Sequence, residues 1–101
     1  MSLIDLFSLN GSVAVITGAG KGIGRAIALA YADAGAKVVC AARTLSDVEA
    51  VANEIKARGG EAIAVTCDVT CAENREALVQ QAVAAFGKIT HLVNNAGGGG
   101  P

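Results

Sequence analysis

One stretch decides how the chain folds: Thr17-Gly18-Ala19-Gly20-Lys21-Gly22-Ile23-Gly24. It follows an apolar segment, 13–16, that is typical of a buried parallel strand, and it precedes an alanine-rich segment, 25–32, that is typical of a helix. A strand, a glycine turn and a helix N-terminus form an anion site, because amide groups point outward and the helix dipole attracts negative charge. We therefore interpret the stretch as a dinucleotide-binding loop, whose glycines let the backbone approach a pyrophosphate.

The spacing of the glycines narrows this interpretation. Gly18, Gly22 and Gly24 fit the pattern G-x-x-x-G-x-G, whereas the common pattern G-x-G-x-x-G fails from either starting glycine. The phosphate loop of NTPases fails as well, because Lys21 is not followed by the Ser or Thr that would hold magnesium. Taken by itself, the loop could still be an ordinary glycine-rich turn between a strand and a helix.

Composition favours a single α/β domain and excludes several classes of partner. The 101 residues are 52% hydrophobic but only 3% aromatic, so the core must consist of Val, Ile, Leu and Ala, as where helices pack on a parallel sheet. The formal net charge of −1 provides no basic face for nucleic acid or an anionic membrane. No apolar segment approaches the ~20 residues that span a bilayer, and the N-terminus lacks the basic start of a secretion signal. We expect a cytoplasmic protein.

The three cysteines predict neither a disulfide framework nor a metal site. Their number is odd, and Cys40 falls inside a predicted strand, where it would be a small buried apolar residue. Cys67 and Cys71 are four residues apart, but a metal site would need further ligands, and the lone His91 lies far along the chain. We therefore predict no bound metal.

Strands and helices alternate strictly along the chain. We predict strands over 13–17, 37–42, 62–67 and 91–94, and helices over 23–34, 46 or 47 to 58, and 72–86. The residues expected to face inward from the last helix are Leu78, Ala82, Ala85 and Phe86. This alternation predicts a parallel sheet with right-handed crossovers and the strand order 3-2-1-4, which is the N-terminal part of a Rossmann-type doubly wound fold.

The strand over 91–94 would be an open edge of that sheet. Its apolar residues Leu92 and Val93 would be poorly covered, and a bare parallel edge favours association. We therefore interpret residues 1–101 as the N-terminal part of a longer protein.

The segment after the second strand predicts which dinucleotide binds. An NAD-specific site places Asp or Glu there to bind the ribose hydroxyls, but this chain has Ala42-Arg43-Thr44. An acid would repel a 2′-phosphate, whereas the forked guanidinium of Arg43 can bind it. Lys21 could add a second positive charge at the same phosphate. Although both cations could instead be solvated surface residues, we predict NADP rather than NAD.

Two further motifs follow the third and fourth strands. The carboxylate of Asp68 can accept the exocyclic amine of adenine, and Val69 can pack on the ring; by local chemistry, Asp68 could equally cap the next helix. The segment Asn94-Asn95-Ala96-Gly97 places amides where they can bridge strand backbones and the ribose, and its two small residues leave room for a flat cofactor. Alone, that segment could be an ordinary turn.

In order and spacing, these residues resemble the short-chain dehydrogenase/reductase family. The motifs that carry the resemblance are Thr17-Gly18-x-x-x-Gly22-x-Gly24, Asp68-Val69 and Asn94-Asn95-Ala96-Gly97, and it covers about residues 9–97. The resemblance implies an NAD(P)-dependent oxidoreductase acting on an alcohol or ketone, with Thr17 and Asn94 tying two strands together. In this family, basic residues at the positions of Lys21 and Arg43 accompany NADP. The expected cofactor-binding residues are Gly18, Lys21, Gly22, Ile23, Gly24, Arg43, Thr44, Asp68, Val69, Asn95, Ala96 and Gly97.

The resemblance supplies no catalytic residue within this chain. Family members run to roughly 250 residues, and their catalytic Ser, Tyr-x-x-x-Lys pair and helix Asn lie beyond position 101. Residues 1–101 are thus expected to be an NADP-binding region that ends before the catalytic part of a homotetrameric enzyme.

The tail over 94–101 resembles the same segment of 7α-hydroxysteroid dehydrogenases, which implies a hydroxysteroid substrate. A 3-oxoacyl-carrier-protein reductase and a sugar or polyol dehydrogenase remain alternatives, because the substrate loop is absent. A non-catalytic dinucleotide-binding module using the same fold is a third alternative. A small-molecule substrate is expected for each of the enzymes.

Overall fold

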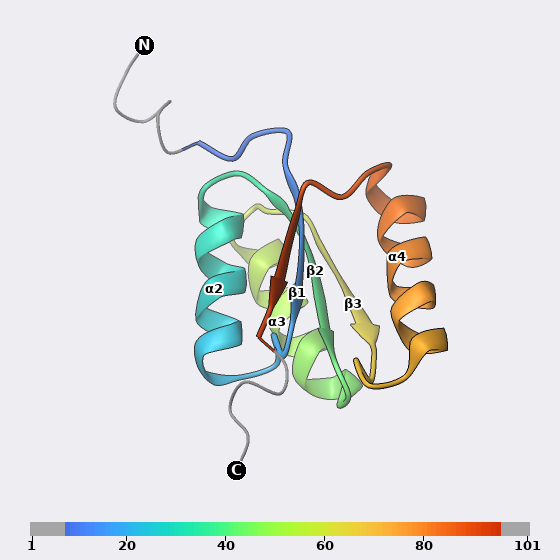
Figure 1. Ribbon diagram of the computed structural model, residues 1–101. Coiled ribbons are helices and arrows are strands. Elements are labelled where there is room, and N and C mark those ends of the chain that lie inside the picture. The colour runs from blue at the N-terminus through green and yellow to red at the C-terminus, as the bar shows by residue number, and fades with distance from the viewer. Residues whose placement is uncertain (1–7, 96–101) are drawn as a thin grey trace.

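The computed structural model describes residues 8–95 of the chain. Helices lie on both sides of a central parallel sheet (Figure 1). The elements are β1 (Val13–Thr17), α2 (Gly22–Asp33), β2 (Lys37–Ala42), α3 (Leu45–Ala57), β3 (Ala62–Thr66), α4 (Ala72–Phe86) and β4 (His91–Asn94). The strand order β3-β2-β1-β4 confirms the predicted Rossmann-type topology. In the part of the chain described, no helix has both the length and the apolar character needed to cross a membrane.

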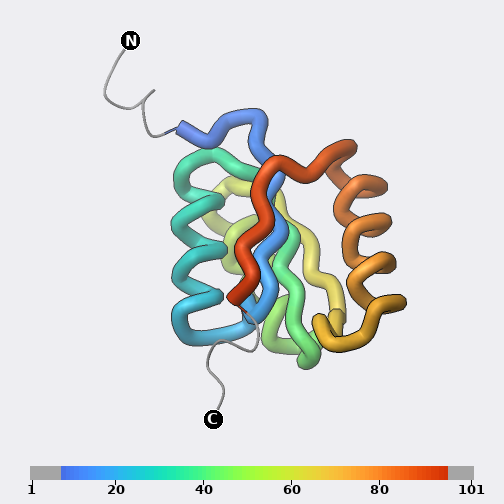
Figure 2. The backbone as a smooth tube through the Cα atoms, viewed as in Figure 1, coloured from blue at the N-terminus to red at the C-terminus, as the bar shows by residue number. Residues whose placement is uncertain are grey.

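The sheet has an apolar layer on each face because its central strands are buried on both sides. All five residues of β1 are buried, as expected for a parallel strand between two helical layers. Alternate side chains point to opposite faces: Ile16 and Val38 pack toward α2 and α3, whereas Val15 and Val39 pack toward α4. Figure 2 shows α2 and α3 on one side of the sheet and α4 on the other.

The element boundaries differ from the predicted ones by one or two residues. Helix α2 begins at Gly22 and α3 at Leu45, each slightly earlier than predicted, and β3 ends at Thr66. The N–H of Cys67 still donates to the carbonyl of Ala42 at 2.9 Å, so strand-like pairing continues to the predicted end of β3.

Helix α4 buries a narrower stripe than the sequence pattern predicts. Leu78 and Ala82 are buried and Phe86 is half-buried, as predicted, but Ala85 is exposed, and that part of the prediction is wrong. The helix contacts mainly β3 and β2, which lie toward the edge of the sheet opposite β4. Because the sheet lies under only part of α4, positions turned away from those strands remain exposed, including Val79 and Val83.

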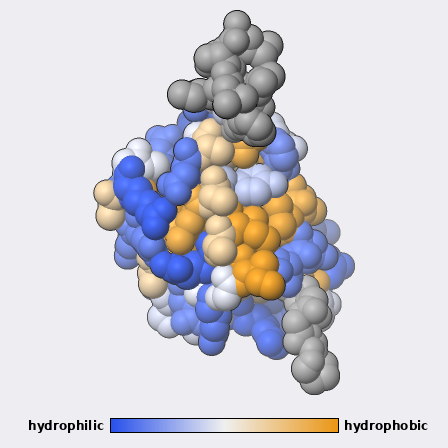
Figure 3. Space-filling model, turned by 90° about the vertical axis from the view of Figure 1, so that its left-hand side faces the viewer, coloured by the Kyte–Doolittle hydropathy of each residue, from blue (hydrophilic) through white to orange (hydrophobic). Residues whose placement is uncertain are grey.

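Strand β4 forms the edge of the sheet next to β1. Its residues pair in register with 14–17 of β1, from Ala14 opposite His91 to Thr17 opposite Asn94. Leu92 is 68% exposed and Val93 is half-buried, which confirms the poorly covered edge. Apolar side chains gather on the side of the molecule where α2 and β4 lie (Figure 3).

Candidate functional site

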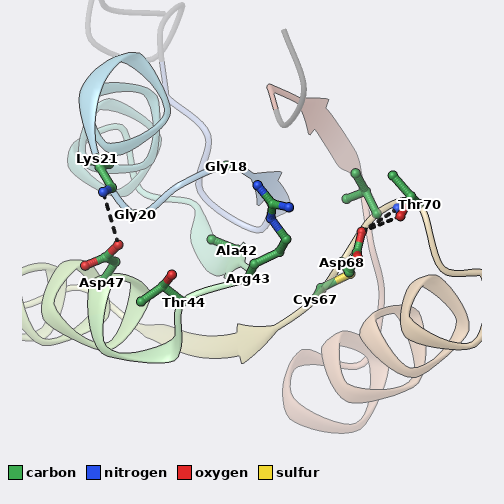
Figure 4. A pocket seen from close by; sticks show the side chains of 11 residues that line it. Gly18, Gly20, Lys21, Ala42, Arg43, Thr44, Asp47, Cys67, Asp68 and Thr70 are labelled. Carbon is green, nitrogen blue, oxygen red and sulfur yellow. Dashed lines mark hydrogen bonds and ion pairs between the residues drawn. The ribbon is translucent and has the colours of Figure 1, made fainter. Parts of the chain in front are cut away.

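The carboxyl ends of β1, β2 and β3 surround a cavity of about 420 Å³ (Figure 4). A cavity of this size is typical of small-molecule sites. In open parallel sheets, ligands bind outside the carboxyl ends of the strands, where this cavity lies. The residues that line it are Gly18, Gly20, Lys21, Ala42, Arg43, Thr44, Asp47, Cys67, Asp68, Val69 and Thr70.

The structure brings half of the predicted site residues together at this cavity. These are Gly18, Lys21, Arg43, Thr44, Asp68 and Val69. Gly22, Ile23 and Gly24 lie in the first turn of α2, next to the cavity but not among its lining residues. Asn95 lies against the glycine loop, and Ala96 and Gly97 fall outside the described residues.

Two glycines of the loop have distinct structural tasks. Gly18 turns the chain out of β1 with φ +65°, a left-handed conformation that favours glycine. Gly24 allows close packing: a Cβ there would overlap the carbonyl group of Gly18 and would lie 2.8 Å from Nδ2 of Asn95. The first turn of α2 can therefore pack directly on the turn that follows β1, which brings the helix N-terminus to the cavity.

The N-terminus of α2 suits an anion better than those of the other two helices. Its first turn contains no acidic residue, and no side chain within residues 8–95 caps it. Helices α3 and α4 instead carry Asp47 and Glu73 in their first turns. The first intrahelical bond runs from the N–H of Arg25 to the carbonyl of Lys21, at 3.3 Å. The amides of the first turn thus present the positive end of the helix dipole, where a phosphate can bind.

Arg43 directly follows β2 and reaches into the space between the glycine loop and Asp68 (Figure 4). Backbone hydrogen bonds hold this end of β2 in place. The carbonyl of Ala41 accepts from the N–H of Ala19 at 3.2 Å, on the loop side, and that of Ala42 accepts from Cys67 on the β3 side. Lys21 and Arg43 are therefore two cations, from separate segments, at one cavity.

Asp68 presents a charged carboxylate to the cavity. Its Oδ1 accepts hydrogen bonds from the Thr70 hydroxyl at 2.6 Å and the Thr70 N–H at 2.9 Å. These two bonds, and then the positive charge of Arg43, lower the pKa of Asp68 below its ordinary value. The N-cap of α4 is Cys71, and no side chain among the described residues caps that helix, so the alternative that Asp68 is the helix cap is not what the structure shows.

We expect the substitution Thr70→Val to raise the pKa of Asp68 toward its ordinary value. The change removes the hydroxyl donor that most stabilises the carboxylate and keeps the backbone N–H. A titration followed by NMR at the Asp68 carboxyl carbon measures the shift. Thr66→Val, on an exposed residue at the end of β3, is the control and should leave this pKa unchanged. An unshifted pKa in Thr70→Val would rule out the hydroxyl as a donor.

The buried Thr17 joins the glycine loop to β4. Its hydroxyl donates to Oδ1 of Asn94 at 3.0 Å and accepts from the N–H of Asn95 at 3.1 Å. The side chain of Asn95 in turn donates to the carbonyl of Gly18 at 3.4 Å. Thr17 and Asn94 thus have the strand-tying role that the resemblance implied, and Asn95 supports the loop from behind.

Five lining residues were not among the predicted site residues: Gly20, Ala42, Asp47, Cys67 and Thr70. Asp47 is the one that adds a charge beside Lys21. Oδ2 of Asp47 lies 3.7 Å from Nζ of Lys21. Gly20 makes room for this approach, since a Cβ there would lie 2.7 Å from Cβ of Asp47. The sequence carries one signal for Asp47, which is its position three residues after Thr44, the N-cap of α3. The first turn of α3 therefore lies at the same edge of the sheet as the end of β2.

Cys40 and Cys67 are both buried, and of the two only Cys67 lines the cavity. Burial raises the pKa of Cys40 to about 12. Burial, followed by the negative charge of Asp68, also raises the pKa of Cys67, so this thiol forms an uncharged wall of the cavity. Between residues 8 and 95, no three His, Cys, Asp or Glu side chains come together as a candidate metal site.

Comparison with known sequences identifies relatives over nearly the whole chain. The family described as short chain dehydrogenase matches residues 12–101. A 7α-hydroxysteroid dehydrogenase of Escherichia coli is 46% identical over 97 residues, which are 96% of this chain and 38% of that protein. An uncharacterised oxidoreductase of Mycobacterium tuberculosis is 51% identical over 96 residues, which are 95% of this chain and 36% of that protein.

Comparison with solved structures gives the same result. The structure of a 7α-hydroxysteroid dehydrogenase complexed with NADH and 7-oxo glycochenodeoxycholic acid is 46% identical and superposes with a TM-score of 0.94. The alignment covers 100% of this chain and 40% of that one, so the chain spans about two fifths of the length of its relatives. On its sequence, its topology and its glycine loop, this chain belongs to the short-chain dehydrogenase/reductase family.

Proposed function

We propose that this chain is the NADP-binding part of an oxidoreductase that interconverts an alcohol and a ketone. Family membership supports the reaction class. The observation that carries the choice of NADP is the presence of Lys21 and Arg43 at one cavity, with Ala42-Arg43-Thr44 where an NAD-specific site has an acid. Both cations can bind a 2′-phosphate, Arg43 through two parallel hydrogen bonds and Lys21 as a point charge.

The cavity residues fit the parts of a dinucleotide. The N-terminus of α2 would hold the pyrophosphate, and Lys21 and Arg43 would hold the 2′-phosphate. The carboxylate of Asp68 would accept the adenine amine, while Val69 would pack on the ring. The bound cofactor would supply a nicotinamide that accepts or donates hydride. The task of these 101 residues is therefore to bind and orient the cofactor.

We propose a hydroxysteroid as the substrate of the intact enzyme. The supporting observation is the 46% identity to 7α-hydroxysteroid dehydrogenases. The chain contains no Tyr-x-x-x-Lys, the pair that carries proton transfer in this family, so the proposed activity is that of a protein containing the catalytic part as well. The homotetramer and the cytoplasmic location stay predictions.

We expect Arg43→Ala to weaken NADPH binding by ~1.5–3 kcal/mol, or about 10- to 150-fold, and to leave NADH binding nearly unchanged. The lost contacts are charge-assisted hydrogen bonds to a phosphate that NADH lacks. Calorimetric titration of the purified protein with each cofactor measures both affinities, and the unsubstituted protein should bind NADPH more tightly than NADH.

Arg58→Ala is the matched control for this experiment. Arg58 is, like Arg43, an exposed arginine, but its ion pairs, with Asp33 and Glu54, lie outside the cavity. It should leave the affinity for both cofactors unchanged. Equal losses of NADPH and NADH affinity in Arg43→Ala would refute the assignment of a 2′-phosphate site.

A further inference from the structure

Lys21 and Asp47 form an ion pair at the rim of the cavity (Figure 4). The Lys21 side chain is 85% exposed and that of Asp47 is 34% exposed, so the carboxylate is the more enclosed partner. Both residues line the cavity, Lys21 from the glycine loop and Asp47 from the first turn of α3. The pair therefore occupies the side of the cavity where β2 ends, which is the side proposed for the 2′-phosphate.

Two backbone features hold Asp47 in this position. Its N–H donates to the carbonyl of Thr44 at 3.2 Å, in the first turn of α3. On the other side it lies against Gly20, where even a methyl group would come within 2.7 Å of Cβ of Asp47. The carboxylate is thus anchored beside the glycine loop, whereas the long side chain of Lys21 can leave it.

The charges that line the cavity cancel. Lys21 and Arg43 are positive, and Asp47 and Asp68 are negative. Arg43 is the cation whose charge acts on Asp68, and Lys21 is paired with Asp47. A phosphate monoester carries about −1.5 to −2 charges near neutral pH. Such a group must therefore compete with a carboxylate that is already present in the protein.

We propose that Asp47 is a specificity-determining residue that competes with the 2′-phosphate of NADP for Lys21. Its carboxylate neutralises the Lys21 ammonium that would otherwise bind the phosphate, whereas NAD has an uncharged hydroxyl at that position. Asp47 therefore reduces the preference for NADP that Lys21 and Arg43 create. This inference rests on the proposed 2′-phosphate site. It adds a residue that weakens the binding of the phosphate there.

The test is the substitution Asp47→Asn, which removes the charge and keeps the size of the side chain. It should strengthen NADPH binding about 3- to 10-fold and change NADH binding less than about twofold. Asp47→Ser also removes the charge, and serine is a good residue for a first helical turn. It should give the same result, which shows that the gain does not come from a contact made by the asparagine amide. Asp33→Asn is the matched control, because Asp33 also pairs with a cation, at 3.0 Å, but outside the cavity.

A second comparison tests whether the effect passes through Lys21. In a Lys21→Met background, the gain from Asp47→Asn should fall below about twofold, because the competition has been removed. A gain that persists without Lys21 would contradict the proposed competition. Weaker NADH binding in Asp47→Asn would identify Asp47 as an acceptor for the ribose hydroxyls and would overturn the inference, as would unchanged affinity for both cofactors.

The two proposals can fail separately. Equal losses in Arg43→Ala show that the 2′-phosphate site is wrong, whatever Asp47 does. A selective loss of NADPH affinity in Arg43→Ala, with no gain in Asp47→Asn, retains the 2′-phosphate site and rejects the role of Asp47. Circular dichroism of each variant before titration confirms that the compared proteins are folded.

Discussion

Gly24→Ala is expected to lower the free energy of unfolding by about 3 kcal/mol, although helix propensity alone favours alanine over glycine by about 1 kcal/mol. Gly24 is the third residue of α2, and its φ is not positive, so backbone strain plays no part. The added Cβ would overlap the carbonyl group of Gly18. Because that obstacle is backbone, the clash can be relieved only by moving the helix away from the turn. Urea unfolding followed by circular dichroism measures the loss.

Gly22→Ala separates this packing effect from backbone strain. Gly22 has φ +60°, but nothing lies within 4 Å of the position that its Cβ would take. The substitution should cost only the strain of a left-handed alanine, about 1–2 kcal/mol. Gly24→Ala should therefore be the more damaging of the two. A Gly24→Ala protein as stable as the unsubstituted one would show that the loop adjusts and that close packing does not require glycine there.

The fold could be predicted because local signals and topology agree. The strand β1 consists of five residues buried on both faces, and such strands are continuous apolar segments in the sequence. Strict alternation with helices then allows few topologies, since parallel crossovers are right-handed. The start of α3 was missed by one or two residues, because Thr44, which has an extended conformation, is the N-cap and Leu45 is already helical.

The part of the site that follows strands directly could also be predicted. Gly18, Arg43 and Asp68 come after β1, β2 and β3 within the first two residues, and parallel strands end at one edge of a sheet. The position of Asp47, three residues after Thr44, indicates the same edge of the sheet but does not predict that the side chain reaches the cavity. Its place at the cavity depends on how closely α3 approaches the glycine loop, and only the absence of a side chain on Gly20 permits that approach.

The exposure of Ala85 shows a second limit of sequence patterns. Helical periodicity predicts which residues share a face with Leu78, but it does not predict how much of that face the sheet covers. The width of the buried stripe depends on where α4 lies over the sheet, and α4 lies mainly over β3 and β2. The sequence therefore predicts the direction of the buried face and not its extent.

Ile16→Ala is expected to lower the free energy of unfolding by about 4 kcal/mol, within the range for large-to-small changes in a core. Ile16 is fully buried in β1, between Cys40 of β2 and Val93 of β4. Its side chain packs in the apolar layer beneath α2 and α3. Since backbone pairing on both sides holds β1 in place, the strand cannot move to fill the space, and a cavity remains.

Ile23→Ala is the matched control, because it removes the same atoms from a side chain that is 73% exposed. Its effect should stay within about 0.5 kcal/mol, as for surface substitutions without special contacts. Ile23→Ala is a control for stability only, because Ile23 is itself an expected cofactor-binding residue. Ile16 immediately precedes Thr17 and Gly18, which shape the loop. We expect Ile16→Ala to weaken NADPH binding as well, through a displaced loop. A stable Ile16→Ala protein would mean that the neighbouring helices collapse into the space and that the layer beneath α2 is less rigid than its burial indicates.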